Sequence, residues 1–215
     1  MFQFLVAVIA SGVLGGIFSL IWFFTSTPLD RLRSESRKRH WRSEIALDGL
    51  GYSIDGMTDG WDWHATWNGR LIKPLFELTV AEQQQTDNWL FLGQRNSRTA
   101  PNSILLDYAF NRNALPRWVL TFSQARELHT QTPEFDREFF LAAASEENPG
   151  RILLTPGLVS KLTSLPETIR RGLLIIRGGG ELRIRIEGFQ TGDEYVSIDE
   201  ICQLASEVKE HLKLG

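Results

Sequence analysis

Residues 61–69 read WDWHATWNG, and this stretch decides the fold. Large apolar and polar side chains alternate, which is the period of a β-strand with one buried face. Trp61, Trp63 and Trp67 therefore point to one side of the strand, and His64 points to the other. The closing Asn-Gly pair is a strong signal for a hairpin turn. We expect the tryptophans to fill a sheet core, and an exposed aromatic binding platform is the alternative.

The surrounding sequence extends this sheet. Leu71 to Val80 is the expected partner strand, with Pro74 at an edge or bulge. Alternating Leu182, Ile184 and Ile186 predict a second hairpin over 173–187, whose Arg183, Arg185 and Glu187 face water. Further strands are predicted over 88–93, 104–110, 118–122 and 139–143.

Helix signals appear mainly towards the C-terminus. Thr155-Pro156 predicts the start of a short helix that Pro166 ends. A capping box at 197–200 predicts a last helix running to Leu212. The predicted fold class is α+β: a single N-terminal transmembrane helix followed by a mainly antiparallel-sheet soluble domain with a few packed helices.

The N-terminus is apolar. Residues 1–29 hold no charged side chain, and Phe2–Phe24 would span about 34 Å as a helix, enough for a bilayer core. A signal peptide is the alternative, but the run is too long and lacks a basic start. We predict an anchor at 1–26, a basic juxtamembrane helix or linker at 27–46, and a cytoplasmic globular domain at 47–215.

A basic collar follows the apolar run. Six Lys or Arg residues stand against Glu35 alone, which gives this stretch a charge of +5. Such residues attract anionic lipid headgroups and favour the cytoplasmic side, so we predict an inner-membrane protein with its N-terminus outside. Setting topology alone is the competing interpretation. The predicted headgroup contacts are Arg31, Arg33, Arg37, Lys38, Arg39 and Arg42.

The apolar run also carries small residues at four-residue spacing. Small side chains let helix backbones approach closely in lipid, so the stripe predicts packing against another transmembrane protein or a second copy. The competing interpretation is that Gly, Ala and Ser are common in membrane helices. The predicted helix-packing residues are Ala7, Ser11, Gly12, Gly15, Gly16 and Ser19.

The sequence supplies little for chemistry. Cys202 is the single cysteine, which excludes a disulfide framework and a cysteine-based metal cluster. His64 with Asp62 lacks a third ligand at motif spacing, so a polar surface pair is expected. Gly178–Gly180 lacks a phosphate-loop pattern and reads as a hairpin turn. We expect no catalytic residue, cofactor, metal or nucleic-acid partner.

Two stretches, 49–69 and 132–156, resemble bacterial membrane-anchored proteins with a cytoplasmic domain. The resemblance implies no activity and no functional residue. From the packing stripe we predict a non-catalytic accessory or scaffold subunit docked on a larger membrane complex, of which a bioenergetic complex is one example. A membrane-anchored module that senses a ligand or lipid is the alternative, and an enzyme with a dispersed site ranks third.

Overall fold

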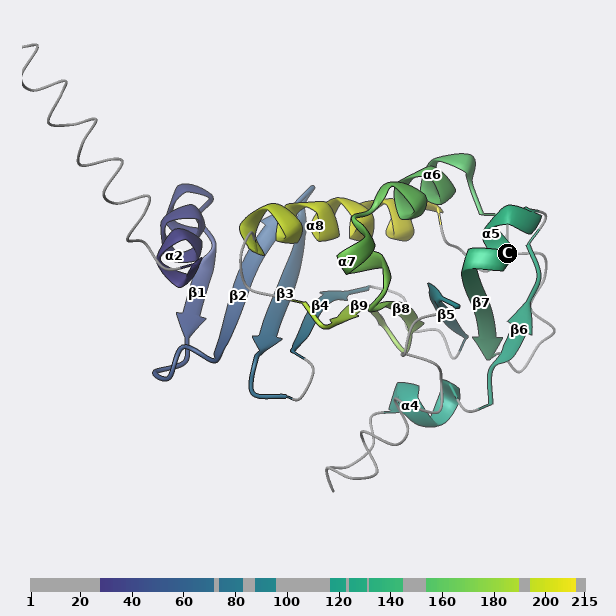
Figure 1. Cartoon of the computed structure of the whole chain (residues 1–215), viewed down its shortest axis with the longest axis horizontal. Coiled ribbons are helices and arrows are strands. Elements are labelled where there is room, and N and C mark those ends of the chain that lie inside the picture. Colours follow the sequence, from purple (N-terminus) through teal and green to yellow (C-terminus); the bar gives the residue numbers. More distant parts are fainter. Residues whose placement is uncertain are drawn as a thin grey trace, which may run out of the picture.

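The computed structural model describes residues 28–71, 74–82, 88–95, 117–122, 124–130, 132–144, 154–189 and 194–211. Within them nine strands form one sheet in the order β1-β2-β3-β4-β9-β8-β5-β7-β6 (Figure 1). Every neighbouring pair of strands is antiparallel. The strands are β1 (Arg42–Ile45), β2 (Gly51–Thr58), β3 (Trp61–Asn68), β4 (Leu75–Ala81), β5 (Trp89–Gln94), β6 (Arg126–Leu128), β7 (Phe139–Ala144), β8 (Leu173–Gly178) and β9 (Glu181–Glu187).

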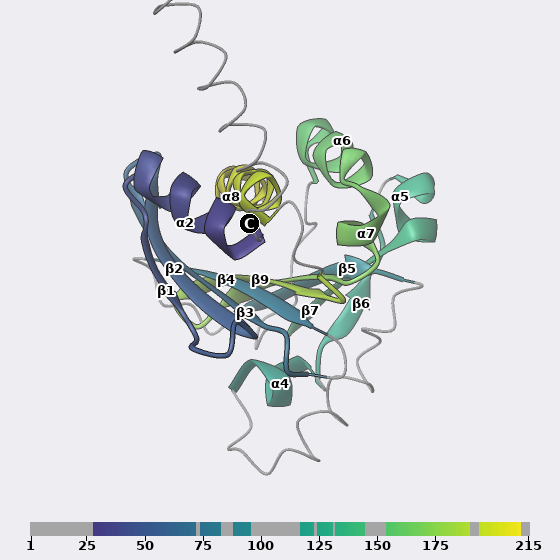
Figure 2. The same cartoon turned by 60° about the vertical axis from the view of Figure 1, so that its left-hand side comes forward.

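Helices cover both faces of the sheet unequally. Helices α2, α5, α6, α7 and α8 lie on one face and α4 lies on the other, as Figure 2 shows. The large core lies under the five helices, and a smaller one, which includes Phe91 and Trp118, lies under α4. The helices are α2 (Pro28–Lys38), α4 (Arg117–Phe122), α5 (Pro133–Glu138), α6 (Pro156–Ser164), α7 (Glu167–Arg170) and α8 (Glu194–His211).

The predicted fold class, with its transmembrane helix, is corrected here. The described architecture is a mostly antiparallel sheet with several helices, and none of the described helices is long and apolar enough to cross a membrane. The longest of them, α8, has 18 residues, and Asp199, Glu200 and Glu207 are among its charged side chains. The predicted span, Phe2–Phe24, lies outside the described residues.

Strand β3 follows the predicted alternation. Trp63, Ala65 and Trp67 are buried, and Trp67 stacks on Tyr52 with ring centres 5.5 Å apart. Trp61 is half-buried, and the Lys209 ammonium lies 5.4 Å from its ring centre. The core prediction is therefore confirmed for Trp63 and Trp67, which belong to the large core rather than to an exposed platform.

Two local predictions differ from the structure. Helix α2 covers Pro28–Lys38, only the first part of the juxtamembrane helix or linker predicted at 27–46, and His40 follows with φ of 59°. The predicted strand 118–122 is wrong, because this segment forms helix α4. A run of six residues with several apolar side chains is too short for its periodicity to distinguish a strand from a helix. The predicted strand 104–110 lies outside the described residues.

The C-terminal elements agree more closely with the sequence. Strands β8 and β9 form the predicted hairpin, and Gly179 and Gly180 at its turn have φ of 63° and 85°, which favours glycine. Helix α6 begins after Thr155, whose hydroxyl accepts a hydrogen bond from the Leu158 amide at 3.3 Å. Helix α8 begins at Glu194, three residues before the predicted capping box.

One glycine before β8 is fixed by close backbone contact. A Cβ added at Gly172 would lie 2.0 Å from the carbonyl oxygen of Glu187, whereas a Cβ added at Gly157 would meet nothing within 4 Å. We expect Gly172→Ala to lower the free energy of unfolding by about 1–3 kcal/mol, because the backbone must move to admit a methyl group. Gly157→Ala is the control and should leave stability unchanged or slightly raised. Urea denaturation of both variants measures the difference, and equal stabilities would contradict the prediction.

Candidate functional site

Three exposed leucines gather at one end of the sheet. Leu47 and Leu50 lie in the loop between β1 and β2, and Leu71 lies in the loop between β3 and β4. Leu47 is fully exposed, while Leu50 and Leu71 are 47% and 39% exposed. The loops are joined by a 2.9 Å hydrogen bond from the Gly69 amide to the Leu50 carbonyl. We call Leu47, Leu50 and Leu71 the leucine tip; they are three of the five large apolar side chains exposed on the described residues.

An ion pair also joins the two loops. Arg70 donates hydrogen bonds to Oδ2 of Asp48, from Nε at 2.9 Å and from a terminal guanidinium nitrogen. The Oδ1 atom of Asp48 accepts from the Leu50 amide at 3.0 Å, and Asn68 accepts in the same way from the Arg70 amide. The Leu50 amide, followed by Arg70, lowers the pKa of the Asp48 carboxyl. The two opposite charges at this end of the sheet therefore lie side by side.

Helix α2 begins at the same end. The backbone of Gly49, with φ of 68°, approaches Leu29 so closely that an added Cβ would lie 3.3 Å from its side chain. Leu29 is in the first turn of α2, and Leu32 is fully buried in the core. The 27 residues before Pro28 carry no charged side chain. An apolar stretch of sequence is thus joined to the folded part beside the leucine tip.

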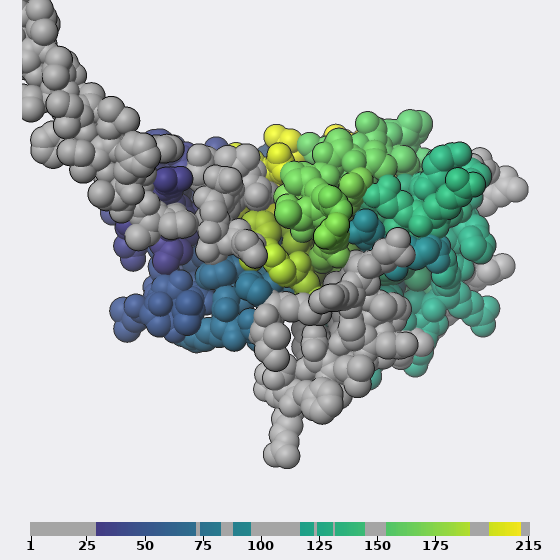
Figure 3. Space-filling view, viewed as in Figure 1, coloured from purple at the N-terminus to yellow at the C-terminus, as the bar shows by residue number. Residues whose placement is uncertain are grey.

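The six basic residues predicted to contact lipid lie on α2, on the turn after it and on β1 (purple to blue in Figure 3). Arg31 lies in the first turn of α2, the turn beside the leucine tip. Arg37, which is exposed and has no ion pair with any described residue, lies about 9 Å further along the axis. Four of the six have carboxylate partners: Arg33 with Asp30 (3.6 Å), Lys38 with Glu35 (2.7 Å), Arg42 with Glu44 (3.2 Å) and Arg39 with Asp199.

The structure therefore brings only part of the predicted collar to the leucine tip, and most of it is ion-paired. The helix-packing residues predicted from sequence fall outside the described residues: Ala7, Ser11, Gly12, Gly15, Gly16 and Ser19. The exposed leucines were not predicted as a site. Isolated leucines near strand ends carry no sequence signal that separates exposed side chains from core ones.

A charged cluster lies on the face of the sheet that α4 covers. Glu77 accepts a hydrogen bond from Arg183 at 2.6 Å and lies 3.1 Å from the Arg185 guanidinium. Arg185 is only 6% exposed, and its guanidinium carbon lies 4.9 Å from the ring centre of Trp118 on α4. The prediction that Arg185 faces water is wrong, because α4 packs over this part of β9. Pairing with Glu77 offsets the cost of burying the arginine.

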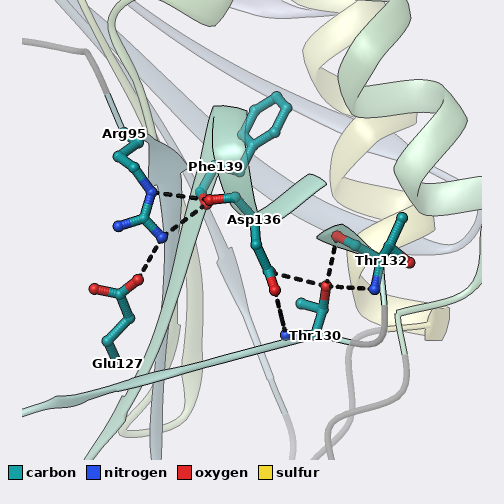
Figure 4. Close-up of polar contacts among 6 residues, drawn as sticks. All are labelled: Arg95, Glu127, Thr130, Thr132, Asp136 and Phe139. Atoms are coloured by element: carbon teal, nitrogen blue, oxygen red, sulfur yellow. Dashed lines mark hydrogen bonds and ion pairs between the residues drawn. The ribbon is translucent and has the colours of Figure 1, made fainter. Parts of the chain in front are cut away.

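A polar network fixes the corner between β6 and α5 (Figure 4). Arg95 donates from Nε to the carbonyl of Asp136 at 2.9 Å and also binds the Glu127 carboxylate. The Asp136 carboxylate accepts from the Thr130 amide at 3.0 and 3.1 Å and from the Thr130 hydroxyl at 2.8 Å. This carboxylate holds the chain turn in place, so the network is a structural tie.

Two other reactive side chains, His64 and Cys202, are engaged or buried. His64 lies 2.7 Å from Asp55 through Nδ1, rather than pairing with the expected Asp62, and both partners are half-exposed or more. In the described part of the chain, no group of three His, Cys, Asp or Glu could hold a metal ion. Burial, with a smaller effect of Asp199, raises the pKa of the Cys202 thiol to about 12.

Comparison with known proteins gives one informative match. No protein-family model matches the chain, and no curated protein matches it. Among solved structures, it is similar to the mycobacterial trehalose monomycolate transport factor A, TtfA, with a TM-score of 0.52 and 9% sequence identity. The match covers 85% of this chain and 92% of that one. This likeness shows a shared fold.

The charged cluster yields a stability prediction. We expect Glu77→Ala to lower the free energy of unfolding by about 2–3 kcal/mol, because it removes a carboxylate partner of the buried Arg185. Glu181→Ala is the control, since among the described residues the Glu181 carboxylate pairs with Arg183 alone, which is more exposed than Arg185. It should cost less than about 1 kcal/mol. Denaturant unfolding of both variants measures the costs, and a larger loss for Glu181→Ala would contradict this account.

The thiol yields a pH prediction. In the unfolded chain Cys202 ionises near pH 9.0, whereas in the folded chain it ionises only near pH 12. Because the unfolded state loses the proton first, stability should fall as pH rises above about 9, by at most about 1.4 kcal/mol per pH unit. The Cys202→Ala variant should lack this contribution to the loss of stability at high pH, and urea unfolding of both proteins at pH 8 and pH 10 measures it.

The burial of the thiol is tested by chemical labelling. At pH 7 a maleimide should leave the native Cys202 thiol unmodified and should rapidly label an added cysteine at the exposed Leu47→Cys position. Rapid modification of Cys202 in the folded chain would contradict the assigned burial.

Proposed function

We propose that this chain is a non-catalytic factor in lipid transport that works at the cytoplasmic surface of the inner membrane. The observation that carries the proposal is the fold match with TtfA, a transport factor for trehalose monomycolate. The match covers most of both chains, so it concerns the domain as a whole rather than one motif. The substrate proposed for this chain is a membrane lipid, with no particular headgroup assigned.

The described surface supports a role at a membrane. The leucine tip exposes apolar side chains beside the start of α2, where the uncharged sequence of residues 1–27 is joined. The exposed Arg37 adds a positive charge, which an anionic cytoplasmic leaflet attracts. A free thiol at Cys202 agrees with a reducing compartment.

The proposal gives the chain no chemistry of its own. Asp136 and Glu77 are engaged in structural hydrogen bonds, and the Cys202 thiol is buried and protonated at neutral pH. The accessory-subunit hypothesis depends on small residues outside the described part of the chain. The lipid-transport role is supported by described residues and by the fold comparison, so we prefer it to the accessory-subunit hypothesis.

The experiment is to remove the protein from its native cell and to measure every lipid class in the separated membrane fractions. We expect one class to accumulate in the inner membrane and to fall where it is normally delivered, and the wild-type chain to restore the distribution. Met57→Asp, an exposed residue at the other end of β2, should restore it equally well.

An unchanged lipid distribution would contradict the proposed function. If a stoichiometric membrane complex then co-purified with the chain and lost activity in its absence, the accessory-subunit hypothesis would replace it.

A further inference from the structure

We infer that the leucine tip is the part of the folded domain that enters the interfacial region of a lipid bilayer. The inference rests on the proposed function in one respect, since both require a lipid surface, but it is tested separately. Its basis is the position and exposure of Leu47, Leu50 and Leu71 at the ends of two joined loops.

Exposure at the leucine tip is unusual for this chain. Leu47 is fully exposed in a loop that the Asp48–Arg70 ion pair and the Gly69–Leu50 hydrogen bond hold in place. A leucine that an ordered loop holds in water lacks the favourable free energy of burial. Transfer of its side chain into an apolar phase would supply this free energy. Clustered exposed apolar residues are typical of protein or membrane contact sites.

The size of the leucine tip favours lipid over a protein partner. A stable protein interface uses roughly 20–30 residues on each side and needs matching shapes. Three leucines on two narrow loops are far fewer, whereas entry into a bilayer interface requires no complementary surface.

Charge and chain direction favour the same occupant. Asp48 and Arg70 at the tip neutralise each other, so no net charge from this pair opposes entry into the interface. Helix α2 begins beside Gly49, and the residues before it carry no charged side chain. The point where this uncharged sequence joins the folded part therefore lies at the end of the domain that carries the three exposed leucines.

Met57 provides a matched comparison. It is 69% exposed, but it lies near the other end of β2, about 23 Å from Leu50 along the strand. A bilayer that contacts the leucine tip should therefore leave Met57 in water. A protein that bound lipid through exposed apolar residues in general would bring both sites into contact.

The test uses the full chain with one cysteine added to the native Cys202, either at the leucine tip or at the control site. Leu47→Cys, Leu71→Cys and Met57→Cys are each labelled with an environment-sensitive fluorophore, while the buried Cys202 thiol stays unlabelled. The proteins are mixed with vesicles of phosphatidylcholine and phosphatidylglycerol that contain spin-labelled lipid. We expect lipid-dependent quenching at positions 47 and 71, and none at 57.

A second variant checks that the leucines cause the contact. Leu50→Asp should reduce quenching of the fluorophore at position 71 roughly tenfold, as expected when an apolar side chain is replaced by a charge. Met57→Asp should leave that quenching unchanged. Both substitutions are at exposed sites, so circular dichroism should show folded protein in each case.

Quenching at positions 47 and 71 no greater than at 57 would overturn the inference. So would a change in fluorescence at the leucine tip that needs protein at high concentration but no lipid, because that result indicates contact between copies of the chain. Either result could occur while the lipid distribution in cells still depends on the protein. Failure of this inference is thus distinguishable from failure of the proposed function.

Discussion

The ladder between β4 and β9 is the contact on which the rest of the structure depends. It pairs Leu75–Ala81 with Glu181–Glu187 and so joins the meander β1–β4 to the C-terminal strands in one sheet. On one face the ladder contributes apolar side chains to the large core, and on the other it brings Glu77 to Arg183 and Arg185. Without it, the four N-terminal strands would end in an open edge at β4.

The sequence predicts those parts of the fold that depend on near neighbours. The alternation in β3 and the glycine turn after β8 are local patterns, and both are observed. The helix α4 was predicted as a strand, because six residues with several apolar side chains fit either element until the partner surface is known. Arg185 was placed in water for a related reason: the helix that covers it comes from a distant part of the chain.

The candidate site was less predictable than the fold. The six basic residues after the apolar run stand out in the sequence, but the structure pairs four of them with carboxylates, including Arg39 with Asp199 of α8. The leucine tip, by contrast, is not visible in the sequence, because its residues resemble other leucines near strand ends. They form a group only where the two loops meet in the folded chain. The charge of a side chain can be read from the sequence, whereas its exposure to solvent depends on the folded surface.

The same ladder sets an order of events during synthesis. Glu77 and its partner Arg183 are 106 positions apart, so the ribosome delivers β4 long before β9. During that interval β1–β4 can form a meander from local hairpins. The edge of β4 that later pairs with β9 stays unpaired until β9 is synthesised. An unpaired strand is a site for association with other chains. A nascent chain stalled between the two strands would therefore expose a strand edge that chaperones can bind and that the finished protein covers.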